Sequence, residues 1–352
     1  MRNKVDVIIQ ERMVFTAMKK KMLLGFSRYF GAVLVGAFLL LTSSAVSLAA
    51  VWKRINKYGP ESRSGHAMVY DVTNKLALLY GGGAASGGEL NDFWKWDGLN
   101  WTQIDCYPSP GDRSDHAMAY DSNRKATVFF GGWRSGWGNP YMDDTWEWNG
   151  RIWKEIHKKG PSGREKHAMI YDSKRKRIVL FGGYDGNNRL SDTWTYTASG
   201  WKKAAESSPD GPPGLLLHSM AYDAKRDQIV LFGGYSNSGY NGDTWLWNGT
   251  KWTKSAAKGP SPRSGAFMCN DAKAGIILLF GGDSGAWPNY TYHKDTWIWN
   301  GSNWTQLKIS GPSSRSDHRM VYDSVSGNMF LFGGDDPKAW SALRDSWTFT
   351  YK

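Results

Sequence analysis

Five of the seven histidines stand at one position of a string that the chain repeats, and in four of those copies an arginine precedes the histidine by three residues. Imidazole and guanidinium groups at such a spacing could transfer protons, ligate a metal or hold a carboxylate. The string is RSGHAMVYD at 63–71, and it returns as RSDHAMAYD at 113–121, REKHAMIYD at 164–172 and RSDHRMVYD at 315–323, with the looser copies LLLHSMAYD at 215–223 and RSGAFMCND at 263–271. The first question is whether this repetition brings the reactive groups together or keeps them apart.

The histidines occupy one place in each copy, at His66, His116, His167, His218 and His318, with Ala266 in the fifth copy. A catalytic or metal site needs a few groups that converge on one point, whereas a repeat disperses one imidazole to each unit. We therefore expect buried structural histidines, each hydrogen-bonded to a partner such as the aspartate that precedes a tryptophan later in the unit. The sequence predicts no metal site and no cofactor.

The repeated arginines permit two interpretations. They are Arg63, Arg113, Arg164, Arg263 and Arg315, with Leu215 in the fourth copy. Each could bond loop carbonyls and fix its own unit in place. Alternatively, together they could form a cationic collar at the mouth of a channel and bind the carboxylate of a ligand. The sequence leaves both open, and the second makes the five arginines candidate ligand-binding residues.

Short strands must position these groups, because the repeat has a period of 48 to 52 residues with four β-like segments in each unit. The repeated string is strand a, and strand b ends in a glycine doublet, as in IVLFGG at 178–183. Strand c contains Asp-Thr-Trp or a close variant, and strand d starts with a tryptophan, as in WKEI at 153–156. Asn-Gly pairs in the c–d connections, as in WNGRIW at 148–153, are typical of tight hairpins whose central residues have positive φ.

A period near 50 with four strands and a glycine doublet in each unit resembles the Kelch-repeat β-propellers, over residues 52–352. The resemblance is to the extracellular bacterial type, which is grouped with the central domain of galactose oxidase. It implies an all-β fold, a six-bladed β-propeller of four-stranded antiparallel blades. The copper site of galactose oxidase is not predicted, because neither Cys106 nor Cys269 lies near a suitable cluster of Tyr and His.

The two ends of the chain predict how the ring closes. The chain ends in RDSWTFTYK, which is a strand c, so the last unit has no strand d after it. VWKRI at 51–55 matches strand d of the other units. We expect this N-terminal strand to complete the last blade, which leaves the ring no unpaired edge within that blade.

Residues 1–49 have the order of a secretory signal peptide or of an uncleaved signal anchor: a basic segment, the apolar run FGAVLVGAFLLL at 30–41, and then small residues. We expect residues 51–352 to form a single propeller that is secreted or periplasmic and monomeric, with a membrane span only if the leader is not cleaved. The net charge of +12 falls to +7 without residues 1–50, which carry 7 basic and 2 acidic side chains. Such a mild charge does not predict nucleic-acid binding.

Aromatic residues in the b–c connections are the other candidate ligand-binding residues, because the copies differ most in these segments. Of the 20 tryptophans, 16 lie at repeat positions on strands c and d and four do not. Variable aromatic loops at one rim of a rigid ring favour a binding site, and flat aromatic faces suit sugar rings, although packing between loops is an alternative. The candidates are Trp133, Trp137, Tyr141, Tyr184, Tyr235, Tyr240, Trp287, Tyr290 and Trp340, with Tyr292 in the same loops.

Three functions fit these features. We expect an exported binding or interaction protein that takes a glycan or a protein at the rim formed by the b–c loops. The first alternative is an enzyme, because resemblance to the periplasmic sialic acid mutarotase of this family would imply arginines that hold a sugar carboxylate and an acid that moves a proton. The candidate acids are Glu89, Asp283, Asp335 and Asp336. The second alternative is a structural or adhesive envelope module. The sequence favours binding over catalysis, since no motif singles out one acid.

Overall fold

The computed structural model describes residues 50–136, 138–206, 208–286, 289–336 and 341–351. In this part of the chain all regular secondary structure is β-strand, and no helix is long and apolar enough to cross a membrane. Residues 1–49, for which the sequence predicts a signal peptide or signal anchor, lie outside the described residues. The all-β class predicted from the repeat is therefore confirmed.

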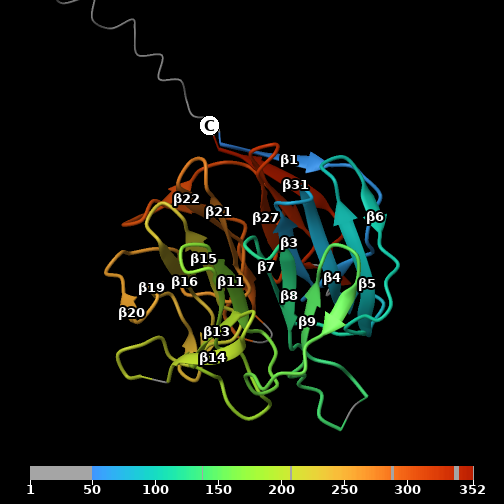
Figure 1. Cartoon of the computed structure of the whole chain (residues 1–352). Coiled ribbons are helices and arrows are strands. Elements are labelled where there is room, and N and C mark those ends of the chain that lie inside the picture. Colours follow the sequence, from blue (N-terminus) through green and yellow to red (C-terminus); the bar gives the residue numbers. More distant parts are fainter. Residues whose placement is uncertain (1–49, 137, 207, 287–288, 337–340, 352) are drawn as a thin grey trace, which may run out of the picture. The chain divides into compact units, whose positions relative to one another are not determined.

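The described strands form six antiparallel sheets, the blades, each running from an inner strand a to an outer strand d (Figure 1). The strands a of successive blades contact one another, and the last contacts the first, so the blades form a ring. The first blade contains β2 (Arg63–Ser64), β3 (Ala67–Asp71), β4 (Leu76–Ala84), β5 (Glu89–Trp96) and β6 (Trp101–Gln103). The second contains β7 (Ala117–Asp121), β8 (Ala126–Phe130), β9 (Thr145–Trp148) and β10 (Trp153–Glu155). The third contains β11 (Ala168–Asp172), β12 (Arg177–Phe181), β13 (Thr193–Thr197) and β14 (Gly200–Ala205).

The remaining blades follow the same order. The fourth contains β15 (Ser219–Asp223), β16 (Gln228–Phe232), β19 (Thr244–Trp247) and β20 (Trp252–Lys254). The fifth contains β21 (Phe267–Asp271), β22 (Ile276–Phe280), β25 (Thr296–Trp299) and β26 (Trp304–Leu307). The sixth contains β27 (Arg319–Asp323), β28 (Asn328–Phe332), β31 (Ser346–Thr350) and β1 (Val51–Ile55). Short hairpins in the b–c loops of these three blades are β17 (Tyr235–Ser236) with β18 (Gly239–Tyr240), β23 (Asp283–Ser284) with β24 (Thr291–Tyr292), and β29 (Asp335–Asp336) with β30 (Ser341–Ala342).

The N-terminal strand closes the ring, as the sequence predicts. Strand β1 pairs antiparallel with β31, and Trp52 lies opposite Phe349. In Figure 1 the blue strand β1 lies against the red strand β31. The last blade is thus built from both ends of the propeller, and its strand c is covered on its outer edge.

The glycine doublet joins neighbouring blades. Its second residue donates a backbone hydrogen bond to the carbonyl at the arginine position of the next blade, as from Gly82 to Arg113 at 2.9 Å. The same bond recurs at each junction, ending with Gly334 to Arg63 at 3.0 Å, so the sixth blade is bonded to the first. Gly81 has a φ of 59°, and a Cβ there would lie 2.7 Å from the Arg113 carbonyl oxygen. Only glycine fits such a close approach at positive φ.

The c–d connections differ from the expected hairpin turn. The φ of Gly150 is positive, at 93°, but that of Asn149 is not. The Asn149 side chain instead accepts hydrogen bonds from the backbone amides of Arg151, at 2.9 Å, and Ile152, at 3.0 Å. The expectation of two positive φ values is wrong because asparagine shapes this turn through its side chain.

The hydrophobic core lies between blades. The ring of Trp52 packs 5.1 Å from Phe280 of the fifth blade and 5.0 Å from Phe349 of the sixth, and its Nε1 donates to Thr296 Oγ1 at 3.1 Å. The strand-d tryptophans Trp201, Trp252 and Trp304 donate in the same way to Thr145, Thr193 and Thr244. Each of these indoles buries roughly 150–250 Å². The repeated tryptophans therefore hold neighbouring blades together.

Candidate functional site

Each repeated arginine is bound inside its own blade. Arg63 donates to both carboxylate oxygens of Asp92, at 2.6 and 2.7 Å, and to the carbonyl of Gly81 at 3.0 Å. The second carboxylate oxygen of Asp92 also accepts from Trp94 Nε1 at 2.6 Å. The equivalent pairs are Arg113 with Asp144, Arg164 with Asp192, Arg263 with Asp295, and Arg315 with Asp345.

These pairs compensate their buried charge. Burial alone would raise the pKa of Asp192, but the hydrogen bonds and charge of Arg164, together with the N–H of Trp194, hold that pKa below its usual range. The pKa values of Asp295 and Asp345 are lowered against burial in the same way. A bidentate arginine fork stabilises the ionised carboxylate strongly when both groups are buried.

The five arginine side chains are at most 2% exposed, so their guanidinium groups do not reach the channel mouth. This arrangement corresponds to the first of the two interpretations that the sequence permits, in which each arginine fixes its blade. Where Leu215 replaces the arginine, Asp243 is bound instead by Lys254 at 2.8 Å. We therefore leave the five arginines out of the site proposed below.

The five repeated histidines are buried separately, one in each of five blades. Desolvation lowers the pKa of each, to about 3 for His218, so the rings are neutral. His116 stacks on Phe129 at 4.4 Å, and His66 meets Phe332 edge-on at 5.6 Å. The expected hydrogen bond to the strand-c aspartate is wrong: that carboxylate binds arginine and tryptophan, or Lys254 in the fourth blade, and the histidine ring nitrogens have no hydrogen-bond partner among the described residues. Among the described residues, no group of three or more His, Cys, Asp or Glu side chains could hold a metal ion.

The residue two positions after each arginine lines the central channel with a left-handed backbone. The φ values lie between 53° and 62° at Gly65, Asp115, Lys166, Leu217, Gly265 and Asp317. The amide of Asp115 donates to the carbonyl of Gly65 at 2.7 Å, and equivalent bonds continue round the ring to that of Asp317 with Gly265 at 2.9 Å. Left-handed backbone is unfavourable for residues such as Lys and Leu and is often found at functional sites.

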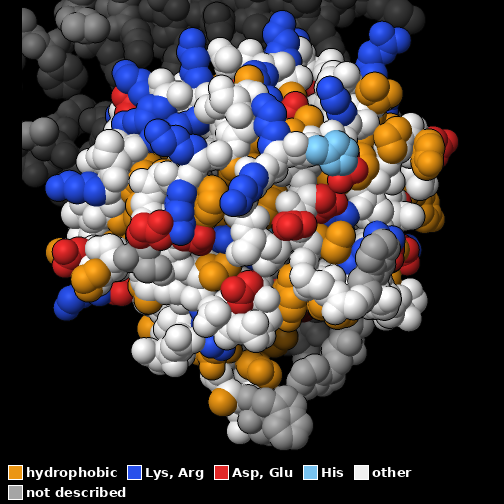
Figure 2. Space-filling model, turned by 60° about the horizontal axis from the view of Figure 1, so that its bottom comes forward, with side chains coloured by type: hydrophobic (Ala, Val, Ile, Leu, Met, Phe, Trp, Pro, Cys, Tyr) orange, Lys and Arg blue, Asp and Glu red, His pale blue; other side chains and the backbone are white. Residues whose placement is uncertain are grey.

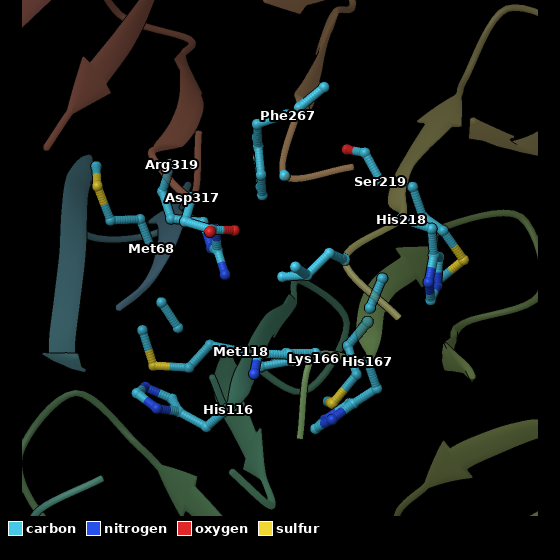
Figure 3. Close-up of a pocket in the computed structure, with 18 residues that line it drawn as sticks. Met68, His116, Met118, Lys166, His167, His218, Ser219, Phe267, Asp317 and Arg319 are labelled. Atoms are coloured by element: carbon cyan, nitrogen blue, oxygen red, sulfur yellow. The ribbon is translucent and has the colours of Figure 1, made fainter. Parts of the chain in front are cut away.

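Charged side chains narrow the channel at this ring. A cavity of about 60 Å³ is lined by Lys166, Asp317, Arg319 and Phe267, among others. Figure 3 shows Lys166, Asp317 and Arg319 reaching toward its centre, while the His116 and His167 rings lie at its periphery. Lys166 Nζ lies 3.2 Å from Glu165 Oε1 and 3.7 Å from Asp115 Oδ2. The acids of the second and third blades are thus matched by a lysine.

Beyond this narrow point, toward the a–b turns, the channel is apolar. A cavity of about 370 Å³ is lined mainly by strand-a residues, including the repeated methionines Met68, Met118, Met169, Met220, Met268 and Met320. These side chains also pack against neighbouring blades, as Met118 does in one core cluster with Val69 and Phe129. The polar and apolar portions of the channel are therefore distinct environments.

A larger pocket opens at the mouth, on the b–c loops of the fourth, fifth and sixth blades. Its volume is about 560 Å³, and tyrosines, serines and three carboxyl groups line it. The acids are Asp283, Asp317 and Asp335, and the aromatic rings are Tyr235, Tyr240, Tyr290 and Tyr292. We refer to these seven residues as the acidic tyrosine pocket.

The carboxyl groups of the acidic tyrosine pocket lack the arginine partners of the blades. Among the described residues, Asp283 accepts from neutral donors, which include Tyr240 Oη at 3.1 Å and Ser264 Oγ at 3.2 Å. Burial raises its pKa. Burial together with the charges of Asp115 and Asp283 raises the pKa of Asp335 to about 6, and the pKa of Asp317 is also well above its ordinary value. Burial without compensating charge favours the protonated acid.

The structure brings together some of the sequence candidates. Tyr235, Tyr240 and Tyr290 line the acidic tyrosine pocket, and the rings of Tyr235 and Tyr240 meet at 5.0 Å. Tyr141 and Tyr184 form a separate T-shaped pair at 5.8 Å on the second and third blades.

The other sequence candidates lie apart from that pocket or cannot be placed. Half-buried Trp133 forms backbone bridges with Ser114 and Tyr141. Trp137, Trp287 and Trp340 lie outside the described residues.

The four acids that the sequence analysis names as candidates do not lie in one site. Asp283 and Asp335 line the acidic tyrosine pocket, whereas Glu89 accepts from Ser135 Oγ at 2.6 Å at the rim of the first two blades. The backbone of Asp336 belongs to β29, and its side chain lies outside the described part of the chain.

Sequence reasoning missed Asp317, Lys166 and Arg319, although a signal existed for the first two. Inside a string that varies little, the two residues after the arginine read SG, SD, EK, LL, SG and SD in the six copies. The residue after the glycine doublet varies as well, and it bridges to the first of these two, as Asp283 does to Ser264 and Asp335 to Ser316. Variable positions within the repeat therefore converge on the channel mouth.

Basic side chains elsewhere on the surface are mixed with acidic ones. Figure 2 shows Lys and Arg interspersed with Asp and Glu over the face in view. In the a–b turn of the third blade, Arg175 is 3.0 Å from Asp172 and Lys174 is 3.5 Å from Asp227. The basic turns are partly neutralised by their own neighbours.

Comparisons with known proteins agree with this architecture. The family model of the KLHDC2/KLHL20/DRC7 Kelch-repeats domain matches residues 147–334. The chain is 26% identical over 203 residues to Mei4-dependent protein 6 of Schizosaccharomyces pombe, a match that covers 50% of this chain and 29% of that protein. This chain thus matches less than a third of that relative's length. The solved structure of YjhT superposes with a TM-score of 0.66 at 16% identity, covering 84% of this chain and 96% of that one, which shows the same fold.

Proposed function

The chain belongs to the Kelch-repeat propellers, and from this premise we propose that it is a binding protein whose ligand, a protein segment or a glycan, enters the acidic tyrosine pocket at the b–c rim. The observation that carries the proposal is the contrast within the ring. The repeated arginines are buried and paired with aspartates, whereas the pocket holds carboxyl groups that form no ion pair among the described residues, beside aromatic rings that are partly exposed. Concave sites of this kind, with a few convergent polar groups, are where ligands bind.

Export of the protein is part of the same proposal. It is supported by the order of basic, apolar and small residues in the first 49 positions. The N-terminal sequence of protein recovered from the periplasm or the medium of a bacterial host tests it. A mature chain that starts near position 50 supports export, and an intact chain found only in the cytosol overturns it.

The enzymatic alternative receives less support. A mechanism like that of the sialic acid mutarotase needs arginines that hold a sugar carboxylate, and the five repeated arginines are bound to aspartates of their own blades. The pocket itself presents carboxyl groups, which would repel a carboxylate ligand once they are ionised. Binding needs none of these arginines.

Removing an exposed ring from the pocket tests the binding proposal. The Tyr290 side chain is 41% exposed and lines the pocket, so Tyr290→Ala should weaken binding on glycan and peptide arrays by about tenfold or more while leaving the fold intact. The control is Val325→Ala, which removes an exposed apolar side chain from the a–b turn of the sixth blade, at the opposite end of the strands.

The pair of variants also separates the adhesive-module alternative from rim binding. Array binding that Tyr290→Ala weakens and Val325→Ala leaves unchanged supports the rim. Binding that survives Tyr290→Ala, or that only Val325→Ala removes, overturns it and favours contacts through other surfaces.

A further inference from the structure

The acidic tyrosine pocket carries more negative than positive charge. Its three carboxyl groups form no ion pair within 4.0 Å among the described residues. Two cations of the central channel are already engaged: Lys166 contacts Glu165 and Asp115, and Arg319 donates to the carbonyl of His318 at 3.0 Å. Arg319 also acts on Asp317 through its charge, so one of the three carboxylates is partly offset. Within the part of the chain that the structure describes, the other two, Asp283 and Asp335, have no ion-pair partner when ionised.

A second observation points to a missing ligand group. The Oδ1 atom of Asp317 is buried and has no hydrogen-bond partner among the described residues. Asp317 lines both the small central cavity and the mouth pocket, and in Figure 3 its carboxyl group points into the cavity. A buried acceptor without a partner costs about 1–3 kcal/mol, so a ligand that donates to it would recover this free energy.

The lining favours an organic cation over a metal ion. No group of three or more possible metal-ligating side chains is found in the described part of the chain. The tyrosine rings instead offer faces, and the guanidinium carbon of Arg189 already lies 5.1 Å from the centre of the Tyr235 ring at the pocket edge. Aromatic faces beside carboxylates bind ammonium and guanidinium groups through cation–π and charge-assisted contacts.

We propose that the acidic tyrosine pocket binds an alkylammonium or guanidinium group, presented as a lysine or arginine side chain by a protein partner. This inference rests on the proposed function and names its ligand chemistry. The hydroxyl groups of Tyr240 and Ser264 hold Asp283 in place, and Asp317 lies at the inner end of the pocket. A long basic side chain therefore places its charged end among the carboxylates and its methylene stem against the tyrosine rings.

The test compares matched probes on the full-length wild-type protein. Four N-acetylated and C-amidated peptides, Gly-Gly-Xaa-Gly-Gly, carry lysine, arginine, norleucine or citrulline at Xaa, and butylamine represents a free amine. Calorimetry or NMR titration should show lysine binding at least about tenfold more tightly than norleucine, and arginine than citrulline. If butylamine binds at least about tenfold more tightly than the norleucine peptide while the lysine and arginine peptides do not, the assignment to a protein side chain is overturned.

Isosteric variants locate the site. Asp283→Asn and Asp335→Asn keep the shape of the side chain and remove its charge, so each should reduce the lysine preference to within about threefold. Asp227→Asn is the control, since that residue lies in an a–b turn, contacts Lys174 at 3.5 Å and has a φ of 53° that asparagine also tolerates. If Asp283→Asn and Asp335→Asn both still bind lysine more tightly than norleucine by the wild-type factor, the inference is overturned. It is also overturned if the control, Asp227→Asn, loses this preference.

Failure of this inference and failure of the proposed function give different results. If charged and uncharged peptides bind alike while Tyr290→Ala still weakens array binding, the rim binds a ligand but not a cation. If no pocket variant changes either the array binding or the peptide titration, the rim itself is not the binding surface. Since the comparison of arginine with citrulline uses wild-type protein, it remains decisive even where a variant fails to fold.

Discussion

Carboxylates inside the blades and carboxylates at the channel mouth experience opposite surroundings in one molecule. Asp295 receives two bonds from Arg263 and one from Trp297, and its pKa is held low. Among the described residues, Asp283 receives bonds from neutral donors such as the Tyr240 and Ser264 hydroxyl groups, and burial raises its pKa. The repeated arginines therefore compensate the aspartates inside five blades, whereas Asp283, Asp317 and Asp335 form no ion pair among the described residues. Such groups are candidates for function because they cost stability.

The two regions should respond oppositely to acid, and the interior should show the larger effect. The folded state keeps five histidines neutral, with the pKa of His218 lowered to about 3 by burial. The contribution of these neutral rings to stability is fully present above the unfolded pKa near 6.5 and is lost as pH falls below it. Below that pKa we expect the free energy of unfolding to fall by about 1.4 kcal/mol per pH unit for each histidine, as measured by urea denaturation in a series from pH 7.5 to pH 5.

The chain provides a matched variant for this prediction. Ala266 occupies the histidine position of the fifth copy, so His218→Ala installs a side chain that the repeat already accepts. It should lower stability at pH 7.5 through the cavity it leaves. Below pH 6.5 its free energy of unfolding should fall less steeply than that of the wild type, by about 1.4 kcal/mol per pH unit. An unchanged slope would contradict the assignment of a neutral buried ring.

The next largest effect should come from breaking one arginine–aspartate pair. Arg263→Ala leaves the buried carboxylate of Asp295 without its cation, and we expect a loss of about 3–5 kcal/mol in urea denaturation followed by tryptophan fluorescence. The double variant Arg263→Leu with Asp295→Asn should lose much less, because no charge remains uncompensated. If the single and double variants lose the same free energy of unfolding, packing and not charge determines how much Arg263 stabilises the protein.

The scaffold could be predicted from the sequence because each of its features recurs six times. The fold follows from the doublet of Gly81 and Gly82 and from the tryptophan that opens strand d. The closure follows from the VWKRI segment, which matches strand d but precedes the first unit. The partners of the repeated groups could not be predicted. Asp92 follows Arg63 by 29 residues, and the one-dimensional pattern does not show whether the histidine or the arginine binds it.

The mouth was only partly predictable, for a related reason. Its tyrosines stand out in the b–c loops, but Asp317 lies inside a repeated string, where its variation resembles ordinary drift. Asp317 meets Asp283 and Asp335 through the ring of left-handed residues at the channel and through backbone bridges within single copies of the repeat, as of Ser264 with Asp283 and Ser316 with Asp335. Only the ring geometry brings these positions into one pocket.

The smallest expected effect is also the one that separates the two regions most directly. The pKa of Asp335 is raised to about 6 by burial and by the charges of Asp115 and Asp283, against hydrogen bonds from Ser64 and Asp317. Tyr292 faces the same group. A raised folded pKa means that the favourable contribution is present below the unfolded pKa near 4 and is lost as pH rises through 6. At pH 7.5 the ionised carboxylate therefore opposes folding.

Asp335→Asn should accordingly stabilise the protein by about 1–2 kcal/mol at pH 7.5, with a smaller gain at pH 5, in paired urea denaturation curves. Asp227→Asn, which removes a carboxylate from an a–b turn, should change stability by no more than about 0.5 kcal/mol at either pH. If Asp335→Asn destabilises at pH 7.5, the mouth carboxylates are compensated like those of the blades and the distinction between the regions fails. If it stabilises the fold while weakening the binding of cationic peptides, the charge is retained for recognition at the expense of stability.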